Sequence, residues 1–337
     1  MGTRALSTNQ GTHRGAFAGV DWVLFLVVGT IWGSSFLFMA IGLEAFRPGL
    51  VTWLRILFGA SALWLVPGAR APIDRADRGR LLLLSVTWVV IPFTLFPLAQ
   101  GSVNSAIAGM LNGAAPIFTA VVATILLRRP PGSRQLVGIP LGFVGVAAIA
   151  LAAAGEGSSQ VVGVVLIIVA TICYGIAFNV ATPLQQRHGS LPVMARILTI
   201  GAVFTAPLGV ASIPGSTFTW PAVLAIAAVG VLGTGVAFVL MGRLVGRVGA
   251  TRASIVGYLI PVVALLLGVL IRNDEVGPFA IAGVALVIVG AYLTSRRETA
   301  PVCSSRSTNT PARKPGIDPP CPTSVCSSTR RTCRPSP

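Results

Sequence analysis

The sequence predicts an all-α membrane protein with ten transmembrane helices, arranged as two inverted five-helix repeats. Three observations favour this fold: charged residues are rare, long apolar stretches recur along the chain, and the two halves resemble each other. Of the 337 residues, 54% are hydrophobic and 10% are charged, and the mean hydropathy is +0.83. Because a soluble domain carries about 25% charged residues, this chain lacks the polar surface that a water-soluble globule needs.

Apolar stretches long enough to cross a membrane recur between residues 20 and 294. A helix of about 20 apolar residues crosses a hydrocarbon core of about 30 Å and pairs all its backbone polar groups internally. The connecting segments are short and contain Gly, Pro or charged residues. The predicted spans are residues 20–41, 50–67, 81–100, 104–127, 136–154, 161–182, 193–213, 220–241, 253–271 and 278–294.

The basic residues predict how these spans are oriented. If the N-terminus is cytoplasmic, 21 of the 25 Lys and Arg residues fall on the cytoplasmic side, and the outer loops contain only Arg47 and Arg272. This bias is typical of multi-pass proteins of the cell membrane and favours an even number of spans with both termini in the cytoplasm. The net charge of +16 therefore indicates membrane topology, and we expect no binding of nucleic acid.

The chain ends differ in composition from the apolar region. Residues 1–19 are predicted to form a cytoplasmic N-terminal segment, and residues 295–337 a disordered, basic cytoplasmic tail that is rich in Ser, Thr, Pro and Arg. The tail holds four of the five cysteines, but none of them is paired in a C-x-x-C motif. We therefore expect neither a metal site nor a cofactor.

An internal duplication is the most informative feature of the sequence. "PIFTAVVATILLRRPPGSRQLVGIPLGFVGV" from Pro116 aligns without a gap with "PVVALLLGVLIRNDEVGPFAIAGVALVIVGA" from Pro261. At this constant offset, Gly138 also matches Gly283. The equal spacing of prolines and glycines is stronger support than the many Ala, Val and Leu matches.

Further upstream the offset between the halves changes by a few residues. There Arg55-Ile56-Leu57 matches Arg196-Ile197-Leu198, and Trp32 aligns with Tyr174. The two repeats are assigned to residues 20–154 and 161–294. Since each has five spans, the second repeat enters the membrane the other way up, which is typical of secondary transporters that work by alternating access.

The sequence resembles the EamA branch of the drug/metabolite transporter superfamily over about residues 20–295. This resemblance implies export or exchange of amino acids, other metabolites or drugs through a central cavity between the halves. Family members often carry a Glu after the fourth and ninth spans, where this chain has Arg129 and Asp274. The resemblance is carried by "IWGSSFLF" (31–38), "TWLRILFGASALWL" (52–65), "SAIAGMLNGAAPIFTAVVA" (105–123), "LGTGVAFVLMGRLVGRVGATRASIVGYLIPVVALLLGVL" (232–270) and "IAGVALVIVG" (281–290).

Two arginines, Arg55 and Arg196, lie inside predicted spans at opposite membrane faces. Charged residues within a membrane are costly and suggest function, so each is a candidate for lining or gating the substrate path. The alternative is that their long side chains reach the lipid headgroups. No Asp or Glu lies deep in any span, which disfavours proton coupling through a central carboxylic acid.

Uncharged polar and aromatic residues are further candidates for the cavity. Substrate sites are mostly apolar with a few polar anchors, although small polar residues in membranes also form hydrogen bonds between helices. Both roles stay open for each residue. The candidates are Trp32, Ser34, Ser35, Trp88, Gln100, Asn112, Tyr174, Asn179 and Tyr258.

Pro116 and Pro261 lie in the middle of predicted spans and are candidate hinges, because proline kinks a helix. The pairs Gly109/Gly113 and Gly138/Gly142 have the spacing that permits close helix packing. Such packing would occur within a monomer or between monomers, so a monomer and a homodimer are both open.

These features favour a secondary transporter, and specifically an exporter of small molecules in the lipid bilayer. The alternative is a non-transporting membrane scaffold or sensor, which has no need of symmetry across the membrane. An enzyme is not expected, because the only histidines, His13 and His188, lie in predicted loops and no acid pair lies in the spans.

Overall fold

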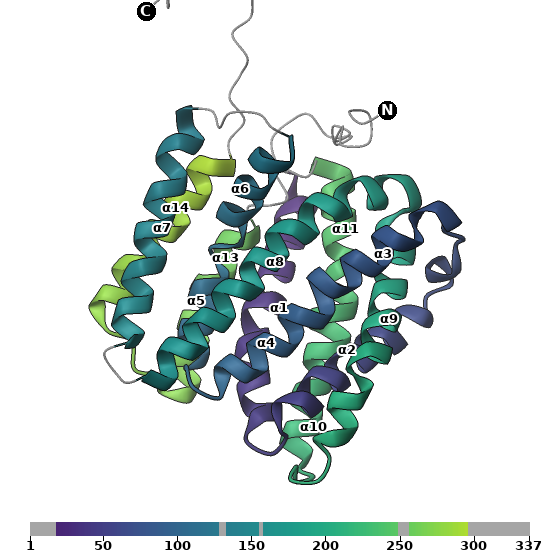
Figure 1. Cartoon of the computed structure of the whole chain (residues 1–337), viewed down its shortest axis with the longest axis horizontal. Coiled ribbons are helices and arrows are strands. Elements are labelled where there is room, and N and C mark those ends of the chain that lie inside the picture. Colours follow the sequence, from purple (N-terminus) through teal and green to yellow (C-terminus); the bar gives the residue numbers. More distant parts are fainter. Residues whose placement is uncertain (1–17, 128–132, 155–157, 249–255, 296–337) are drawn as a thin grey trace, which may run out of the picture. The chain divides into compact units, whose positions relative to one another are not determined.

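The computed structural model describes residues 18–127, 133–154, 158–248 and 256–295. The chain divides into two units, residues 1–298 and 299–337, and all described residues lie in the first. Apart from residues 18, 19 and 295, the predicted terminal segments lie outside the described residues. The described part is helical, as the prediction of an all-α fold required, and it contains no strand ladder (Figure 1).

The helices of the first repeat correspond to the first five predicted spans, with short 3-10 turns in one connection. Proline begins α2 at Pro48, and Asn104 caps α5 by accepting a hydrogen bond from the Ile107 amide at 2.8 Å. The elements are α1 (Gly19–Leu43), α2 (Pro48–Trp64), η2 (Pro67–Arg70), η3 (Arg75–Asp77), α3 (Arg78–Ser85), η4 (Val86–Val90), α4 (Ile91–Gln100), α5 (Ser105–Asn112), α6 (Ala115–Leu127) and α7 (Ser133–Ala154).

The second repeat follows the same order. A single residue, Gly189, joins its first two helices, and its φ of 85° is a conformation that glycine adopts without steric cost. The elements are α8 (Ser158–His188), α9 (Ser190–Ala211), α10 (Trp220–Ala228), η5 (Val229–Val236), α11 (Ala237–Val248), α13 (Val256–Arg272) and α14 (Pro278–Ser295).

Six of the helical stretches in the described part are long and apolar enough to cross a membrane, so the chain is a multi-pass membrane protein. Three shorter apolar helices add to them, Leu136–Ala152, Val256–Arg272 and Pro278–Leu293. The total of ten crossings stays a prediction. The six long stretches are Gly19–Leu43, Arg75–Gln100, Ser105–Ile125, Ser159–His188, Ser190–Ala211 and Trp220–Leu244.

Several predicted boundaries were wrong. The span predicted at 50–67 ends at Trp64, because the chain turns into η2 before the exposed connection. The span predicted at 161–182 continues to His188, because polar residues extend the helix beyond the apolar run. The span predicted at 104–127 is interrupted at Gly113 and Ala114, between α5 and α6.

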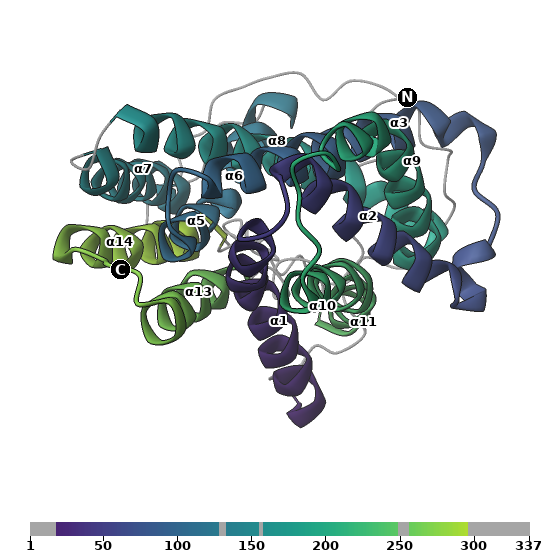
Figure 2. The ribbon, with the colours of Figure 1, turned by 90° about the horizontal axis from the view of Figure 1, so that it is seen from below.

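Helices of the two repeats pack against each other in exchanged pairs: the first helix of each repeat lies against the third and fourth helices of the other repeat. α1 lies against α13 and against α10 and α11, as Figure 2 shows. Its counterpart α8 lies against α6 and α4, which are the counterparts of α13 and α11. The self-equivalent pairs α2 with α9 and α7 with α14 also pack together. The repeats therefore interlock about a pseudo-twofold axis.

The contact between α7 and α14 shows how the two repeats are oriented relative to each other. A Cβ added to Gly145 would lie 2.6 Å from the Gly283 carbonyl oxygen, and one added to Gly290 would lie 2.7 Å from that of Gly138. Residue numbers rise along one helix as they fall along the other, so the equivalent helices are antiparallel. The prediction of inverted repeats is confirmed by this packing.

A second glycine-lined contact joins α5, and the break that follows it, to α13. A Cβ at Gly109 would overlap Ala264, and one at Gly113 would lie 3.1 Å from Pro261. The predicted close packing at these two glycines thus occurs within one chain. Small residues permit such close approach of helix backbones.

Both repeats contain a π-helical turn at the equivalent place, in the middle of their third helix. The turn η4 lies between α3 and α4, and η5 lies between α10 and α11. In η5, the Thr234 hydroxyl donates to the Val229 carbonyl oxygen at 3.0 Å. Because π-helical turns are rare and occur frequently at functional sites, this pair marks the region where the repeats meet.

Candidate functional site

Aromatic side chains from both repeats form an unbroken series of ring contacts in the interior, which we call the aromatic chain. Neighbouring ring centroids lie 5.1 to 6.2 Å apart. The series unites the predicted residues Trp32, Trp88 and Tyr174. In contact order its members are Phe36, Phe96, Tyr174, Phe178, Trp88, Phe238 and Trp32.

Trp32 links this aromatic chain to the π-helical turn of the second repeat. Its indole nitrogen donates to the Gly233 carbonyl oxygen in η5 at 3.0 Å. The neighbouring hydroxyls of Ser34 and Ser35 donate to the Ile31 carbonyl oxygen within their own helix, at 3.0 and 2.9 Å. A Cβ added to Gly233 would lie 2.7 Å from the Ser35 hydroxyl oxygen, so Ser35 packs directly against η5.

Arg55 of α2 is buried against α1 and α4, with 7% of its surface exposed. Its guanidinium carbon lies 3.8 Å from the centroid of the Phe93 ring, and Nη1 donates to the Met39 sulfur at 3.8 Å. The Nε atom is buried without a hydrogen-bond partner. Arg55 thus does not reach out of the protein as the alternative interpretation required.

Two further buried polar groups are incompletely paired. Gln100 donates from Nε2 to the Phe36 carbonyl oxygen at 3.0 Å, but its Oε1 atom has no partner. The Oδ1 atom of Asn112 is also buried without a partner. Buried polar atoms without a partner are rare in folded proteins and require an explanation, such as a ligand or water.

Asn179 and Tyr258 bridge helices. The Asn179 amide donates to the Thr119 carbonyl oxygen at 3.1 Å and so joins α8 to α6. The Tyr258 hydroxyl donates to the Ala291 carbonyl oxygen at 2.7 Å and joins α13 to α14. Both residues therefore form hydrogen bonds between helices, which is one of the two roles that the sequence left open for them.

Arg196 occupies the position equivalent to Arg55 but lies in a different environment. Its guanidinium donates to the carbonyl oxygens of Ala69, Ala71 and Pro192 at 2.9, 2.7 and 3.1 Å. It also borders an open cleft of about 550 Å³, which none of the other candidate cavity residues lines. The cleft is lined by Trp64, Pro72, Ile73, Arg78, Leu81, Arg196, Thr199 and Ile200.

The two predicted hinge prolines lie in different settings. Pro116 lies near the middle of the stretch Ser105–Ile125, but it is the second residue of α6 and follows the break after Asn112, so it begins a new helix within that stretch. Pro261 lies inside α13, where it removes one backbone hydrogen bond. A hinge at either residue stays a prediction.

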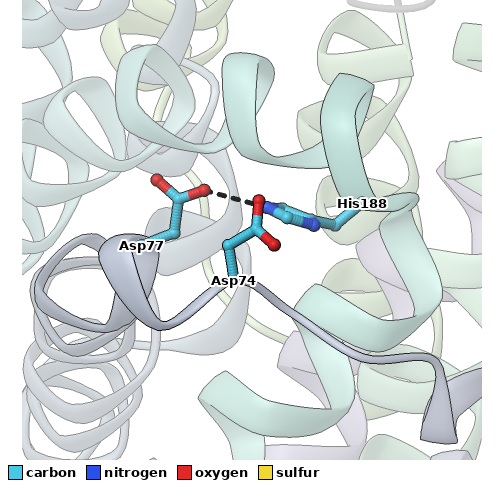
Figure 3. Close-up of side chains that lie close together, drawn as sticks. All are labelled: Asp74, Asp77 and His188. Atoms are coloured by element: carbon cyan, nitrogen blue, oxygen red, sulfur yellow. Dashed lines mark hydrogen bonds and ion pairs between the residues drawn. The ribbon is translucent and has the colours of Figure 1, made fainter.

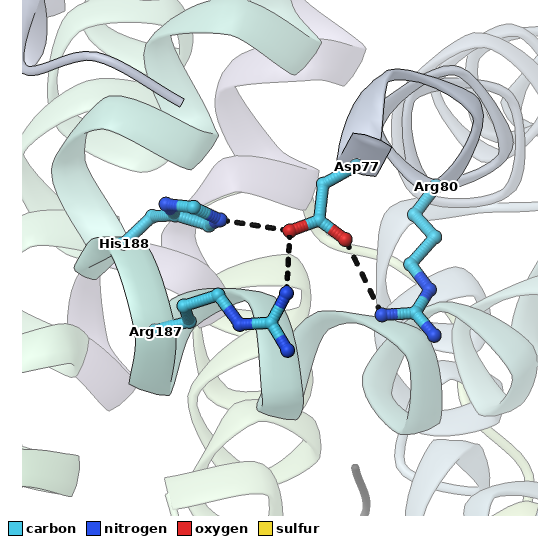
Figure 4. Close-up of polar contacts among 4 residues, drawn as sticks. All are labelled: Asp77, Arg80, Arg187 and His188. Carbon is cyan, nitrogen blue, oxygen red and sulfur yellow. Dashed lines mark hydrogen bonds and ion pairs between the residues drawn. The ribbon is translucent and has the colours of Figure 1, made fainter. Parts of the chain in front are cut away.

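Asp74, Asp77 and His188 lie close together where η3 meets the end of α8 (Figure 3). Their possible metal-ligand atoms lie within 4.8 Å of one another. However, Asp77 also accepts from Arg187 at 3.0 Å and from Arg80 at 3.3 Å, as Figure 4 shows. Because two guanidinium groups and His188 already surround the carboxylate, we interpret this group as an ion-pair cluster.

Ion pairs join the repeats at both ends of α1. Asp21, which is fully buried at the start of α1, pairs with Arg247 in α11. Glu44, just after α1, pairs with Arg272 at 2.6 Å. Asp77 and Arg187 likewise connect the first repeat to the second.

This two-repeat architecture agrees with a comparison to known proteins. The family model of the EamA-like transporter family matches residues 21–151 and 161–296, which together cover most of the chain. The chain belongs to the EamA-like transporter family. The two matched segments coincide closely with the predicted repeats, 20–154 and 161–294.

Curated members related to this EamA-like transporter include named exporters. A probable terminal-alkyne amino-acid exporter of Streptantibioticus cattleyicolor is 28% identical, covering 87% of this chain and 98% of that protein. A probable amino-acid metabolite efflux pump of Escherichia coli is 24% identical, covering 81% and 94%. A solved crystal structure has the same fold, with a TM-score of 0.55 and 17% identity, covering 81% of this chain and 95% of that one.

Asp274, at a position where the resemblance implied a Glu, has a structural role in this EamA-like transporter. Asp274 accepts hydrogen bonds from the Ser105 hydroxyl at 2.6 Å and from the Ala106 amide at 3.1 Å. It therefore caps α5, where a negative charge is favourable. The equivalent residue in the first repeat, Arg129, lies outside the described residues.

Sequence reasoning missed several residues of this region. Phe93, Phe96, Phe178 and Phe238 were not predicted as site residues, because phenylalanine is common in any apolar span. At the constant offset that matches Pro116 to Pro261, Phe93 also matches Phe238, and this signal could have identified two of them. No comparable signal indicated the π-helical turns.

Proposed function

We propose that this chain is a secondary transporter that exports small metabolites, amino acids or drugs across the cytoplasmic membrane by alternating access. The observation that carries the proposal is the exchanged, antiparallel packing of the two repeats around one aromatic chain. Two halves of this kind can exchange conformations, so that a shared central region faces each side in turn. A non-transporting scaffold has no need of this symmetry.

The ion pairs between the repeats support a mechanism with a closing contact on each side. Asp21 and Glu44 lie at opposite ends of α1, so their partners Arg247 and Arg272 mark opposite faces of the membrane. Opening toward one face requires the pair at that face to separate while the other pair holds. We place the Asp21 end, like both chain termini, in the cytoplasm, because the basic residues concentrate on that side.

The placement of the carboxylates supports transport that does not depend on a central acid. All acidic side chains of the described part lie at helix ends or in connections, and none lies near the middle of a predicted span. Proton-coupled carriers often use a buried acid in the membrane interior. We therefore propose facilitated export, or coupling that depends on the charge of the substrate.

Flux measurements in proteoliposomes test the proposal. The purified protein is reconstituted, and uptake and exchange of labelled amino acids, other metabolites and cationic drugs are measured with and without a pH gradient. We expect saturable flux for at least one class that empty liposomes lack. Absence of flux for every class, with a correctly folded and inserted protein, would support the scaffold alternative.

A further inference from the structure

Arg55 carries a positive charge that no carboxylate of the described part neutralises. Its contacts are the Phe93 ring and the Met39 sulfur, and its Nε atom has no partner. A guanidinium stays protonated in proteins, and a cation taken out of water is costly unless it is paired. A stack on an aromatic ring and a weak sulfur acceptor compensate only part of this cost.

The acidic residues of the described part are placed elsewhere. Asp21 and Glu44 pair with Arg247 and Arg272, and Asp77 pairs with Arg80 and Arg187. Asp274 caps α5. Asp74 and Glu275 lie in connections between helices. No carboxylate of the described residues is therefore available to neutralise the charge of Arg55.

The equivalent residue in the second repeat shows that this situation is specific to Arg55. Arg196 donates to three backbone carbonyl oxygens and borders the open cleft. These hydrogen bonds compensate the positive charge of Arg196 within the protein. The duplication placed an arginine at both positions, but only Arg55 is enclosed among apolar side chains.

The surroundings of Arg55 are those of a ligand site with an apolar wall. Arg55 contacts Met39 of α1, and Phe36, a member of the aromatic chain, lies one turn earlier in the same helix. Gln100, whose Oε1 atom is unpaired, is bonded to α1 at Phe36, one turn from the Met39 contact of Arg55. Charged, polar and aromatic groups thus converge on the same turn of α1.

We propose that Arg55 binds the carboxylate of the transported molecule, and that the apolar part of this molecule packs against the aromatic chain. This inference rests on the proposed transport function and specifies the substrate class as small monocarboxylates with an apolar body. A guanidinium binds a carboxylate through two parallel hydrogen bonds. One cation balances one monoanion, whereas a phosphate dianion would need a second basic group.

Binding to the purified full-length protein tests this inference without requiring transport. The probes are two matched pairs, phenylacetate with phenylacetamide and indole-3-acetate with indole-3-acetamide, which differ chiefly in charge. Affinity is measured by the rise in the thermal unfolding midpoint with concentration and by Trp fluorescence. We expect the wild-type protein to bind each carboxylate at least about tenfold more tightly than its amide.

Three variants test whether Arg55 is the residue that recognises the carboxylate. Arg55→Gln should abolish the preference for the carboxylate, and Arg55→Lys should keep part of it, because lysine retains the charge but not the planar fork. Arg196→Gln is the matched control and should keep the wild-type preference. Equal binding of carboxylate and amide by the wild-type protein would overturn the inference, and this comparison remains decisive even if Arg55→Gln fails to fold.

The outcome separates this inference from the proposed function. If cationic or neutral compounds cross proteoliposomes but no carboxylate is preferred in binding, the carboxylate site is wrong while the transport function stands. If carboxylates bind through Arg55 but no compound crosses, transport is wrong while recognition at Arg55 stands. A carboxylate preference that survives in Arg55→Gln would also overturn the assignment to Arg55.

Discussion

Trp32 and Gly233 connect the first helix of one repeat to the π-helical turn of the other through a hydrogen bond of 3.0 Å. The indole ring also contacts Phe238 edge-on, with centroids 5.5 Å apart. A π-helical turn leaves carbonyl groups that the regular helix pattern does not satisfy, and Trp32 supplies a donor to one of them. The contact therefore stabilises the turn and fixes it against α1.

Removing this donor should weaken the contact between the repeats. We expect Trp32→Phe to lower the free energy of unfolding by about 1–3 kcal/mol, because a buried carbonyl group loses its partner. Thermal or denaturant unfolding in detergent measures the change. Trp22→Phe is the control, because Trp22 is half exposed. A loss in Trp32→Phe no larger than in Trp22→Phe would contradict this role.

Close packing of α7 on α14 should depend on the absence of a side chain at Gly145. A Cβ there would lie 2.6 Å from the Gly283 carbonyl oxygen, so Gly145→Ala must push the helices apart. We expect a destabilisation of about 1–3 kcal/mol, which unfolding measurements can detect. Gly79→Ala, in α3, is the matched control, because no atom lies within 4 Å of the added Cβ. Similar unfolding midpoints for both variants would show that the helix contact is not tight.

The buried Asp77 should matter more to stability than the exposed Glu44. The Asp77 side chain is 4% exposed and faces Arg80, Arg187 and His188, whereas that of Glu44 is 61% exposed. We expect Asp77→Asn to cost about 1–3 kcal/mol, because the buried carboxylate loses charge-assisted hydrogen bonds from the half-exposed Arg80 and Arg187 and its contact with the buried His188 ring. Glu44→Gln should cost less than about 1 kcal/mol. The two variants are compared by thermal unfolding, and the reverse order would refute this interpretation.

The proposed orientation can be tested with cysteines in a background that lacks the five native ones. A cysteine in place of the exposed Phe218 should react with a membrane-impermeant thiol reagent from outside intact cells, because residues 214–219 form a predicted outer loop. A cysteine in place of Gly79 should react only after the membrane is permeabilised. If the cysteine at position 79 reacted in intact cells and the one at position 218 did not, the assigned orientation would be wrong.

Much of the architecture could be predicted from the sequence, because it depends on local composition and on the duplication. The apolar runs indicated membrane helices, and the match of Pro116 to Pro261 with an odd number of spans per half indicated inverted repeats. Interruptions within spans were less predictable. The break after Asn112 and the turns η4 and η5 lie against helices from the other repeat, which hydropathy along the chain does not indicate.

The sequence by itself determined that the chain is a duplicated bundle of membrane helices with one arginine at the same place in each half. The tertiary structure decided what surrounds each arginine: backbone carbonyl groups for Arg196, and aromatic and sulfur-containing side chains for Arg55. It also decided which phenylalanines meet in the aromatic chain. The physical reason is that hydropathy and repeat spacing are local properties of the chain, whereas the environment of a charge depends on residues far away in sequence that helix packing brings beside it.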